Sequence, residues 1–175
     1  EQMSELVKSV SANGILVPVL VRPHPNGHGY EMISGHRRMN AAMVNGQEKI
    51  QAIVRELTDD QATIIMVDSN IQRENILPTE RGFAYKMKLD AMIRQSGRPK
   101  DNGSQVGNHL KGKKSIEVLA EEERKSKNQI HRFIRLTELI EPLRDMVDGI
   151  RIDGKKIAFN PAVELSYLSK ENQQF

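Results

Sequence analysis

The 175-residue chain has no cysteine and no tryptophan, and only 4% of its residues are aromatic. The absence of cysteine excludes a disulfide scaffold, thiolate zinc sites and a cysteine nucleophile, and it fits a reducing cytoplasm. The shortage of aromatic rings argues against a stacking platform for single-stranded nucleic acid. No apolar run approaches the roughly 20 residues that a membrane span needs, so the sequence excludes an integral membrane protein. No signal peptide opens the chain, and we expect a cytoplasmic location.

The charges are unevenly distributed along the chain. It has 26 Lys and Arg against 23 Asp and Glu, a formal charge of +3. Residues 94–135 hold 11 of the basic and 5 of the acidic residues, so this stretch carries +6 and the rest of the chain −3. A basic middle on a mildly acidic protein indicates a local surface for a polyanion. A solvated basic loop explains the same charges equally well.

The first half of the chain mixes helical and strand patterns. Helices are expected over residues 1–11, 35–45, 59–70 and 79–95, and strands over 15–21, 30–34 and 50–55. Pro18 favours an edge position for the first strand. The turn-forming residues 24–29 predict a hairpin between the first two strands. Thr58 is the expected N-cap of the third helix.

Residues 96–114 mark the clearest break in the sequence. They include four glycines and one proline and almost no large apolar residue, which predicts a mobile loop or linker. The tail after this break is helical, with helices expected over 116–122, 127–136 and 142–147 and weaker ones from 161. The chain therefore divides into residues 1–95, a linker at 96–114 and a helical part at 115–175.

The first motif with chemical content is Ser34-Gly35-His36-Arg37-Arg38, at a predicted strand-to-helix junction. The free backbone N–H groups and the dipole of a helix start attract anions. Arginine adds forked donors that match phosphate oxygens. Two cations in a first helical turn are unfavourable by themselves, and a bound anion would offset them. Ion pairs between these arginines and nearby carboxylates are the alternative.

The second motif runs from Asp68 to Asn75 and contains Asn70 and Arg73. These two residues are three positions apart, so on a helix they share a face. An amide and a guanidinium together could hold a phosphate or a metal-bound water. Ordinary side-chain pairs at a polar helix end are the alternative, which this segment favours when it is taken alone.

The third motif is a predicted helix–turn–helix over residues 115–136. Ser115 and Ser126 are the expected N-caps of its two helices. The apolar positions at helical spacing are Ile116, Leu119 and Ala120 in the first helix and Ile130, Phe133 and Ile134 in the second. Arg124 occupies the turn position where a glycine is usual, which counts against a DNA-binding motif.

The outer face of the second helix carries side chains that can pair with base edges or reach phosphates in a major groove. They are Lys125, Ser126, Lys127, Asn128, Gln129, His131, Arg132 and Arg135. The alternative is a helical hairpin with a solvated outer face.

Together and in this order, the motifs resemble the ParB/Spo0J/Noc family. Residues 13–22 resemble its Gly-x-x-Gln-Pro-x-x-Val-Arg box, and residues 34–38 with Ala41-Ala42 resemble its Gly-Glu-Arg-Arg box. Residues 70–74, followed by Pro78 and Glu80, resemble its Glu-Asn-x-Gln-Arg-x-x-x-x-Pro-x-Glu box. The resemblance covers nearly the whole chain, and residues 66–85 are most similar to ParB-like proteins of plasmids and conjugative elements.

The resemblance implies an α+β fold. A small mixed-sheet domain that binds CTP would occupy residues 1–95, and an all-α helix–turn–helix DNA-binding domain would follow the linker at 115–175. It further implies a partition protein that binds a centromere-like site on double-stranded DNA as a homodimer, with a clamp that CTP and Mg²⁺ close. A ParA-type ATPase is a further implied partner, and the implied location is the cytoplasm, on the nucleoid or a plasmid.

The resemblance also assigns the nucleotide site by residue. The residues that would hold the nucleotide are Gly35, His36, Arg37, Arg38, Asn70 and Arg73, and Asn70 would also lie near Mg²⁺. Three positions depart from the family boxes: Val17 replaces a Gln, His36 a Glu, and Ser69 the Glu that the family uses for hydrolysis. A serine hydroxyl cannot replace a carboxylate as base or metal ligand at neutral pH. Asp68 is one position away and is expected to point elsewhere, so we expect weak or absent CTP hydrolysis.

Two other functions compete with a partition protein. One is a transcriptional or nucleoid regulator of the same fold that binds DNA without using nucleotide. The other is an enzyme, because the fold also resembles sulfiredoxin-type and nuclease-like domains. Sulfiredoxin chemistry needs a cysteine, which the chain lacks, and Asp59-Asp60 is better explained as a helix start than as part of a nuclease metal site. The five histidines show no metal-ligand spacing.

Overall fold

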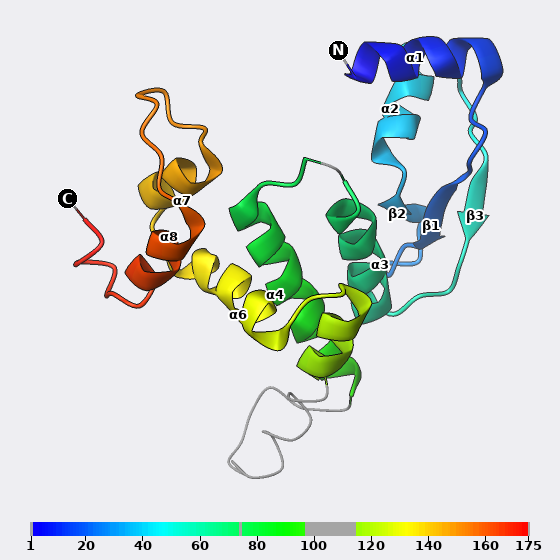
Figure 1. The fold of residues 1–175 in the computed structure, drawn as a ribbon. Coiled ribbons are helices and arrows are strands. Elements are labelled where there is room, and N and C mark those ends of the chain that lie inside the picture. Colours follow the sequence, from blue (N-terminus) through cyan, green and yellow to red (C-terminus); the bar gives the residue numbers. More distant parts are fainter. Residues whose placement is uncertain (1, 74, 97–114, 175) are drawn as a thin grey trace. The chain divides into compact units, whose positions relative to one another are not determined.

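The computed structural model describes residues 2–73, 75–96 and 115–174. The chain divides into two compact units, residues 1–66 and 67–175, each with its own core. Figure 1 shows the elements of both units. Apart from Ser96, the predicted linker at 96–114 lies outside the described residues. Within the described part of the chain, no helix combines the length and the apolar character that crossing a bilayer requires.

The first unit contains a three-stranded sheet and the helices that accompany it. Its elements are α1 (Gln2–Asn13), β1 (Val19–Pro23), β2 (Tyr30–Ser34), α2 (His36–Val44), β3 (Ala52–Val54) and the start of α3 (Asp59–Ile71). β1 pairs antiparallel with β2 and parallel with β3, so the sheet is mixed and has the order β2-β1-β3. The predicted hairpin and the predicted mixed sheet are both confirmed.

The predicted edge position of the first strand is wrong. β1 lies in the middle of the sheet and begins at Val19, directly after Pro18, instead of at residue 15. Proline has no N–H group to donate to a ladder. The first ladder bond is donated by the next residue, Val19, whose N–H lies 3.0 Å from the Gln51 carbonyl oxygen. The proline therefore determines where the strand starts. Because Pro18 lies outside the ladder, its missing N–H does not prevent β1 from pairing with a strand on each side.

Two devices hold the first unit together. α1 packs on α2 around Val10, Ala41 and Ala42, all of them buried. On β1, the buried Arg22 pairs with Glu31 of β2 at 2.6 Å and with Asp59 of α3 at 2.7 Å. The hydrogen bond to Glu31, followed by that to Asp59, raises the pKa of Arg22 above its usual value. One guanidinium thus joins two strands to the start of a helix.

The start of α3 agrees with its prediction. The Thr58 hydroxyl accepts the Gln61 N–H at 3.3 Å, and the Gln61 side-chain oxygen accepts the Thr58 N–H at 3.0 Å. This reciprocal pair is a capping box, which satisfies two backbone donors that a helix start leaves without partners. The cap predicted at Thr58 is confirmed.

The second unit is helical. Its elements are the end of α3, α4 (Pro78–Gln95), a helix at residues 115–122, α6 (Lys127–Arg135), the short 3₁₀ helix η1 (Leu136–Glu138), α7 (Glu141–Asp148) and α8 (Phe159–Leu165). Each predicted helix is found within about two residues of its expected start. Ser115 is itself helical, so it does not have the N-cap position predicted for it. The mixed sheet of the first unit and the helices of the second confirm the α+β class.

Two apolar clusters form the core of the second unit. The first contains Tyr85, Leu119 and Ile130, and it joins α4, the helix at 115–122 and α6. The second contains Leu143 and Val163 among others, and it joins η1, α7 and α8. α4 therefore packs with the helix–turn–helix, whereas the predicted first domain extended to residue 95. Where the nucleotide-binding domain ends stays a prediction.

A buried lysine connects three helices of the second unit. Lys88 of α4 is 3% exposed, and its Nζ lies 2.5 Å from Asp68 near the end of α3 and 2.8 Å from Glu122. Burial strongly favours the neutral amine, but the hydrogen bonds to these two carboxylates outweigh it, and the pKa of Lys88 is raised above its usual value. Lys88 thereby holds α3, α4 and the helix at 115–122 together.

The backbones of α4 and α6 approach closely at Gly82. A β-carbon placed on Gly82 would lie 2.3 Å from the carbonyl oxygen of Phe133 and 3.1 Å from its carbonyl carbon. Only glycine fits this contact without a shift of one helix. Glycine in a helix interior is about 1 kcal/mol less favourable than alanine, so the close packing of the two helices must offset that cost.

We expect Gly82→Ala to lower the free energy of unfolding by about 1–3 kcal/mol, because the added methyl group would have to displace the α6 backbone. In an ordinary helix interior the same change is stabilising. Asp90→Ala, at an exposed position of α4, is the control and should change stability by less than about 0.5 kcal/mol. Urea unfolding followed by circular dichroism measures both variants. A gain in stability on Gly82→Ala would contradict the close approach of the helices.

Candidate nucleotide and DNA interfaces

Gly35 lies at the junction of β2 and α2 and has a backbone conformation that favours glycine. Its φ is +108°, in the left-handed region. A β-carbon there would lie 2.7 Å from the Val19 Cγ1 and 3.2 Å from the Val19 Cα. A side chain at this position would therefore collide with the first residue of the central strand. The glycine lets the start of α2 lie directly against β1.

The start of α2 has the features of an anion site. Gly35 is its N-cap, no side chain caps the helix, and its first turn contains no acidic residue. His36 and Arg37 are exposed on this turn. Neither Arg37 nor Arg38 forms an ion pair with a carboxylate among the described residues. The alternative was that the two arginines pair with nearby carboxylates, and no such pair is found among the described residues.

Arg37 and Arg38 have different surroundings. The Arg38 Nη1 donates to the carbonyl of Val17 and, at 2.8 Å, to that of Pro18, so Arg38 fastens the segment before β1 to α2. The two arginines also line an open hollow of about 550 Å³ together with Glu5, Leu6 and Ser9 of α1. That volume lies within the usual range of small-molecule sites. Arg37 is the exposed cation of the pair, and Arg38 is partly committed to the backbone.

The second motif is only partly helical. Asn70 lies in the last turn of α3, but the helix ends at Ile71 and Arg73 lies beyond it. The Arg73 N–H donates to the Asn70 carbonyl at 3.1 Å, which forms a 3₁₀-type turn of the kind that often ends an α-helix. The prediction that Asn70 and Arg73 share a face of one regular helix is therefore wrong. Glu74, the next residue of the motif, lies outside the described residues.

The parts of the predicted nucleotide site belong to different units. Gly35 to Arg38 lie in the first unit, and Asn70 and Arg73 in the second. The carboxylate of Asp68 pairs with Lys88 at 2.5 Å, and whether Asp68 points away from the nucleotide stays a prediction. Over the residues that the structure describes, no three His, Asp or Glu side chains come together in a group that could hold a metal ion. The assignment of Asn70 to Mg²⁺ stays a prediction.

The helix–turn–helix is confirmed as a structural element. Residues 115–122 form the first helix and Lys127–Arg135 the second. Ser126 caps the second helix as predicted, because its hydroxyl accepts the Gln129 N–H at 3.1 Å. The residues predicted to face inward, Ile116, Leu119 and Ala120 in the first helix and Ile130, Phe133 and Ile134 in the second, all contribute to the same apolar cluster.

Arg124 takes over the role that glycine usually has in the turn. Its φ is +52°, the one left-handed non-glycine residue described. The Arg124 N–H donates to Glu121 at 3.1 Å and the Lys125 N–H to Ala120 at 2.9 Å, which together form a Schellman motif at the helix end. The missing glycine therefore does not prevent the turn, although it leaves some backbone strain.

The outer face of α6 divides into exposed and partly covered side chains. Ser126, Lys127, Asn128, Gln129 and His131 are exposed, whereas Lys125, Arg132 and Arg135 are half-buried. Lys127 pairs with Glu117 of the preceding helix at 2.9 Å, and both side chains are about half exposed. An ion pair of this kind contributes little to stability, so the lysine remains available to another anion.

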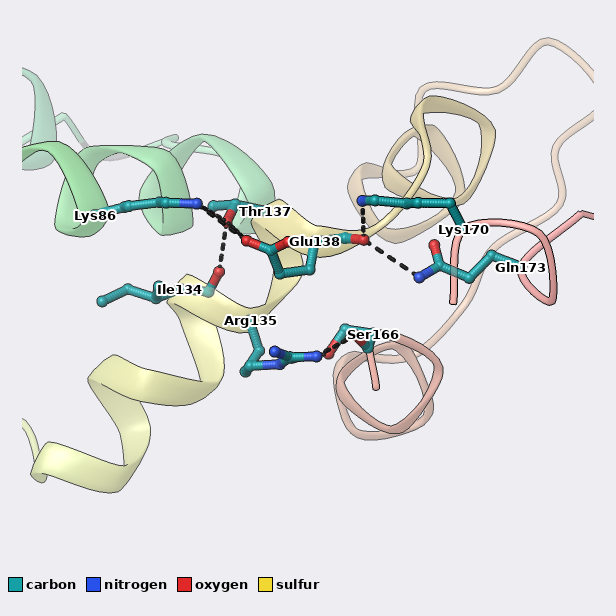
Figure 2. Close-up of polar contacts among 8 residues, drawn as sticks. All are labelled: Lys86, Ile134, Arg135, Thr137, Glu138, Ser166, Lys170 and Gln173. Atoms are coloured by element: carbon teal, nitrogen blue, oxygen red, sulfur yellow. Dashed lines mark hydrogen bonds and ion pairs between the residues drawn. The ribbon is translucent and has the colours of Figure 1, made fainter. Parts of the chain in front are cut away.

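Both arginines of this face have partners near α8. The Arg132 Nη2 donates to the Asn160 Oδ1 at 2.6 Å. The Arg135 Nε donates to the Ser166 hydroxyl at 3.2 Å, and its Nη2 donates to the Ser166 carbonyl (Figure 2). The sequence analysis did not identify Asn160 or Ser166. No local signal could have found them, because they lie 28 and 31 residues from the arginines that they bind.

The comparisons with known proteins agree with these features. Residues 1–71 match the family model of the ParB N-terminal domain. The chain is 38% identical over 95 residues to the chromosome-partitioning protein Spo0J of Thermus thermophilus, which covers 54% of this chain and 35% of that protein. It is 29% identical over 174 residues to a nucleoid occlusion protein of Listeria monocytogenes, covering 99% of this chain and 52% of that protein. The chain thus spans about a third to a half of these relatives' length.

One solved structure has the same fold. It is the C-terminally truncated chromosome-partitioning protein ParB of Caulobacter crescentus, complexed to the centromeric parS site. It matches with a TM-score of 0.56 at 23% identity, over 94% of this chain and 74% of that chain. The match of residues 1–71 to the ParB N-terminal domain and the similarity to these relatives agree with the resemblance to the ParB/Spo0J/Noc family. The resemblance found in the sequence is confirmed.

We expect Arg124→Gly to raise the free energy of unfolding by about 1 kcal/mol, because glycine adopts a left-handed backbone without a steric penalty. Arg124→Ala is the control: it removes the same charge but keeps a β-carbon, so it should not give this gain. Thermal and urea unfolding measure both variants. Equal stabilisation by the two changes would mean that the charge of Arg124, and not its backbone, is what destabilises the turn.

Proposed function

We propose that the chain functions as a ParB-type partition protein that binds a specific site on double-stranded DNA. The observation that carries the proposal is the outer face of α6, which exposes Asn128, Gln129 and His131 while Ile130 is fully buried behind them. Asn and Gln can pair in a bidentate manner with adenine, and the first residues of such a helix are the ones that reach base edges. The match of residues 1–71 to the ParB N-terminal domain and the similarity to the Spo0J protein of Thermus thermophilus support the same function.

Charged residues around this face support binding to a phosphate backbone. Lys125 and Lys127 flank the cap of α6 and lie within residues 94–135, the stretch that carries +6. Lys127 can exchange its exposed partner Glu117 for a phosphate at little cost. We propose that a homodimer binds an inverted repeat, with a ParA-type ATPase as a further partner.

We also propose that the start of α2 binds the phosphates of CTP. Gly35 leaves the backbone N–H groups of the first turn accessible, Arg37 adds an exposed guanidinium, and His36 lies beside it. Arg38 of the same helix start is a further proposed ligand, and the resemblance also assigns Asn70 and Arg73 to the nucleotide. Mg²⁺ would neutralise phosphate charge there, and Asn70 is its proposed ligand from the chain. Because Ser69 replaces the hydrolytic Glu of the family and Asp68 is held by Lys88, we propose weak or absent hydrolysis.

A regulator that binds DNA without nucleotide is the second candidate. Three observations favour it: Val17 and His36 replace the polar and acidic residues of the family boxes, and Arg38 donates to backbone carbonyls. The similarity to a nucleoid occlusion protein is compatible with such a role. The two candidates share the DNA-binding face and differ only in what the start of α2 binds.

Selection from a library of random DNA duplexes tests the DNA-binding part. We expect the wild-type chain to enrich one sequence, arranged as an inverted repeat. The double variant Asn128→Ala/Gln129→Ala should retain binding to random DNA but lose the enrichment, because phosphate contacts are independent of sequence. Ser11→Ala, at an exposed position of α1, is the control and should enrich the same sequence. If the wild-type chain enriches no sequence, the proposed function is wrong.

Calorimetric titration with CTP and Mg²⁺, with ATP, GTP and UTP for comparison, tests the nucleotide part. We expect CTP alone to bind, and Arg37→Ala to weaken that binding by about 10-fold or more, as loss of a charge-assisted contact predicts. Arg55→Ala, at an exposed arginine of the same unit, is the control and should bind as the wild type does. If the wild-type chain binds no nucleotide, the regulator is the better description.

A further inference from the structure

Arg132 of α6 is held from two directions by residues at the start of α8. Its Nη2 donates to the Asn160 Oδ1 at 2.6 Å. Its guanidinium also lies over the ring of Phe159, with the Cζ atom 5.2 Å from the ring centroid. The hydrogen bond fixes the rotation of the guanidinium, and the ring beneath it fixes its tilt. A long side chain with four rotatable bonds is thereby held in one orientation.

The residues that hold Arg132 are themselves fixed by the core. The Phe159 ring packs against the Phe133 ring, with 4.8 Å between centroids and 57° between planes. Phe133 directly follows Arg132 on α6, and Phe159 packs against the second apolar cluster. Asn160 is the second residue of α8. The packing of the two phenylalanines therefore decides where the Asn160 amide meets the guanidinium.

The neighbouring Arg135 shows a different arrangement (Figure 2). Its Nε and Nη2 both donate to Ser166, which is buried, and its guanidinium lies 4.2 Å from the centroid of the Tyr167 ring. These contacts commit Arg135 to fastening α8 to α6. Arg132 has one side-chain hydrogen bond, to the exposed Asn160, and its other N–H groups have no partner within the described part of the chain.

We propose that Asn160 is a positioning residue that presents Arg132 to a base edge, and this inference rests on the proposed binding of a specific DNA site. An arginine reads guanine through two parallel hydrogen bonds, so the plane and rotation of its guanidinium decide whether it can bind. Holding that orientation before DNA arrives reduces the conformational freedom that binding has to remove. An exposed hydrogen bond adds little to fold stability, so orientation is the main effect of the Asn160 contact.

A double-mutant cycle between Arg132 and Asn160 tests the proposal. The variants are Arg132→Ala, Asn160→Ala and the double variant. The probes are the labelled duplex that the wild-type chain enriches and a duplex of the same composition in shuffled order. Fluorescence anisotropy gives the ratio of the two affinities for each variant, and thermal unfolding shows whether each variant remains folded. Asn172→Ala, at an exposed asparagine of the same unit, is the control.

We expect Arg132→Ala to reduce the affinity ratio about 10- to 100-fold, as the loss of one bidentate base contact predicts. Asn160→Ala should reduce it by about 3- to 10-fold while the shuffled duplex binds as before. In the Arg132→Ala background, Asn160→Ala should have no further effect, because Asn160 acts through Arg132. Asn172→Ala should leave the ratio unchanged.

Four results would overturn the proposal. An unchanged ratio on Asn160→Ala would show that Arg132 needs no support, and equal losses on both duplexes would place Asn160 among general phosphate contacts. Additive losses would show that Asn160 acts independently of Arg132. If Arg132→Ala itself leaves the ratio unchanged while the wild-type chain still enriches a sequence, this inference fails and the proposed function stands.

Discussion

The packing of Phe133 is the constraint on which the helical unit depends. Its side chain packs against both apolar clusters. The centroid of its ring lies 5.8 Å from that of the Tyr85 ring and 4.8 Å from that of the Phe159 ring. Its carbonyl is the group that Gly82 approaches too closely for any side chain. One residue of α6 thus fixes that helix against α4 and against α8. Because Arg132 is its neighbour, the same packing decides what the outer face of α6 can present.

Besides the apolar packing of Phe133, the ion pairs of Lys88 hold helices of this unit together. A buried ammonium is tolerated only while its carboxylate partners remain close. Its two nearest partners, Asp68 and Glu122, come from the end of α3 and from the first helix of the helix–turn–helix. The end of α3, which carries Asn70, is therefore connected to the helix–turn–helix through Lys88, and Ile71 of α3 packs against the same apolar cluster. Under the proposed function, that connection links one part of the nucleotide site to the part that binds DNA.

At the start of α2, the backbone conformation and the roles of the two arginines are set by different contacts. Gly35 is fixed by its φ of +108° and by the nearby Val19, so the shape of the helix start does not depend on a ligand. Arg38 has a structural role in bonding to the Pro18 carbonyl, which leaves Arg37 as the exposed cation. Of the three residues that depart from the family boxes, Ser69 is the one at the position that the resemblance assigns to hydrolysis. Under the proposed function, binding of the nucleotide and its hydrolysis therefore depend on different residues.

Local signals in the sequence were sufficient for the helices, their buried faces and the caps at Thr58 and Ser126, but not for the cap predicted at Ser115. Ser126 and Ile130 act on neighbours within one or two turns, so spacing alone reveals their roles. Long-range partners were not predictable: Lys88 meets Asp68 across 20 residues and Arg132 meets Asn160 across 28. The central place of β1 was also missed, because strand order depends on pairing between distant segments. Only tertiary packing decides which acceptor a long side chain reaches, since no feature within a few residues of that side chain encodes it.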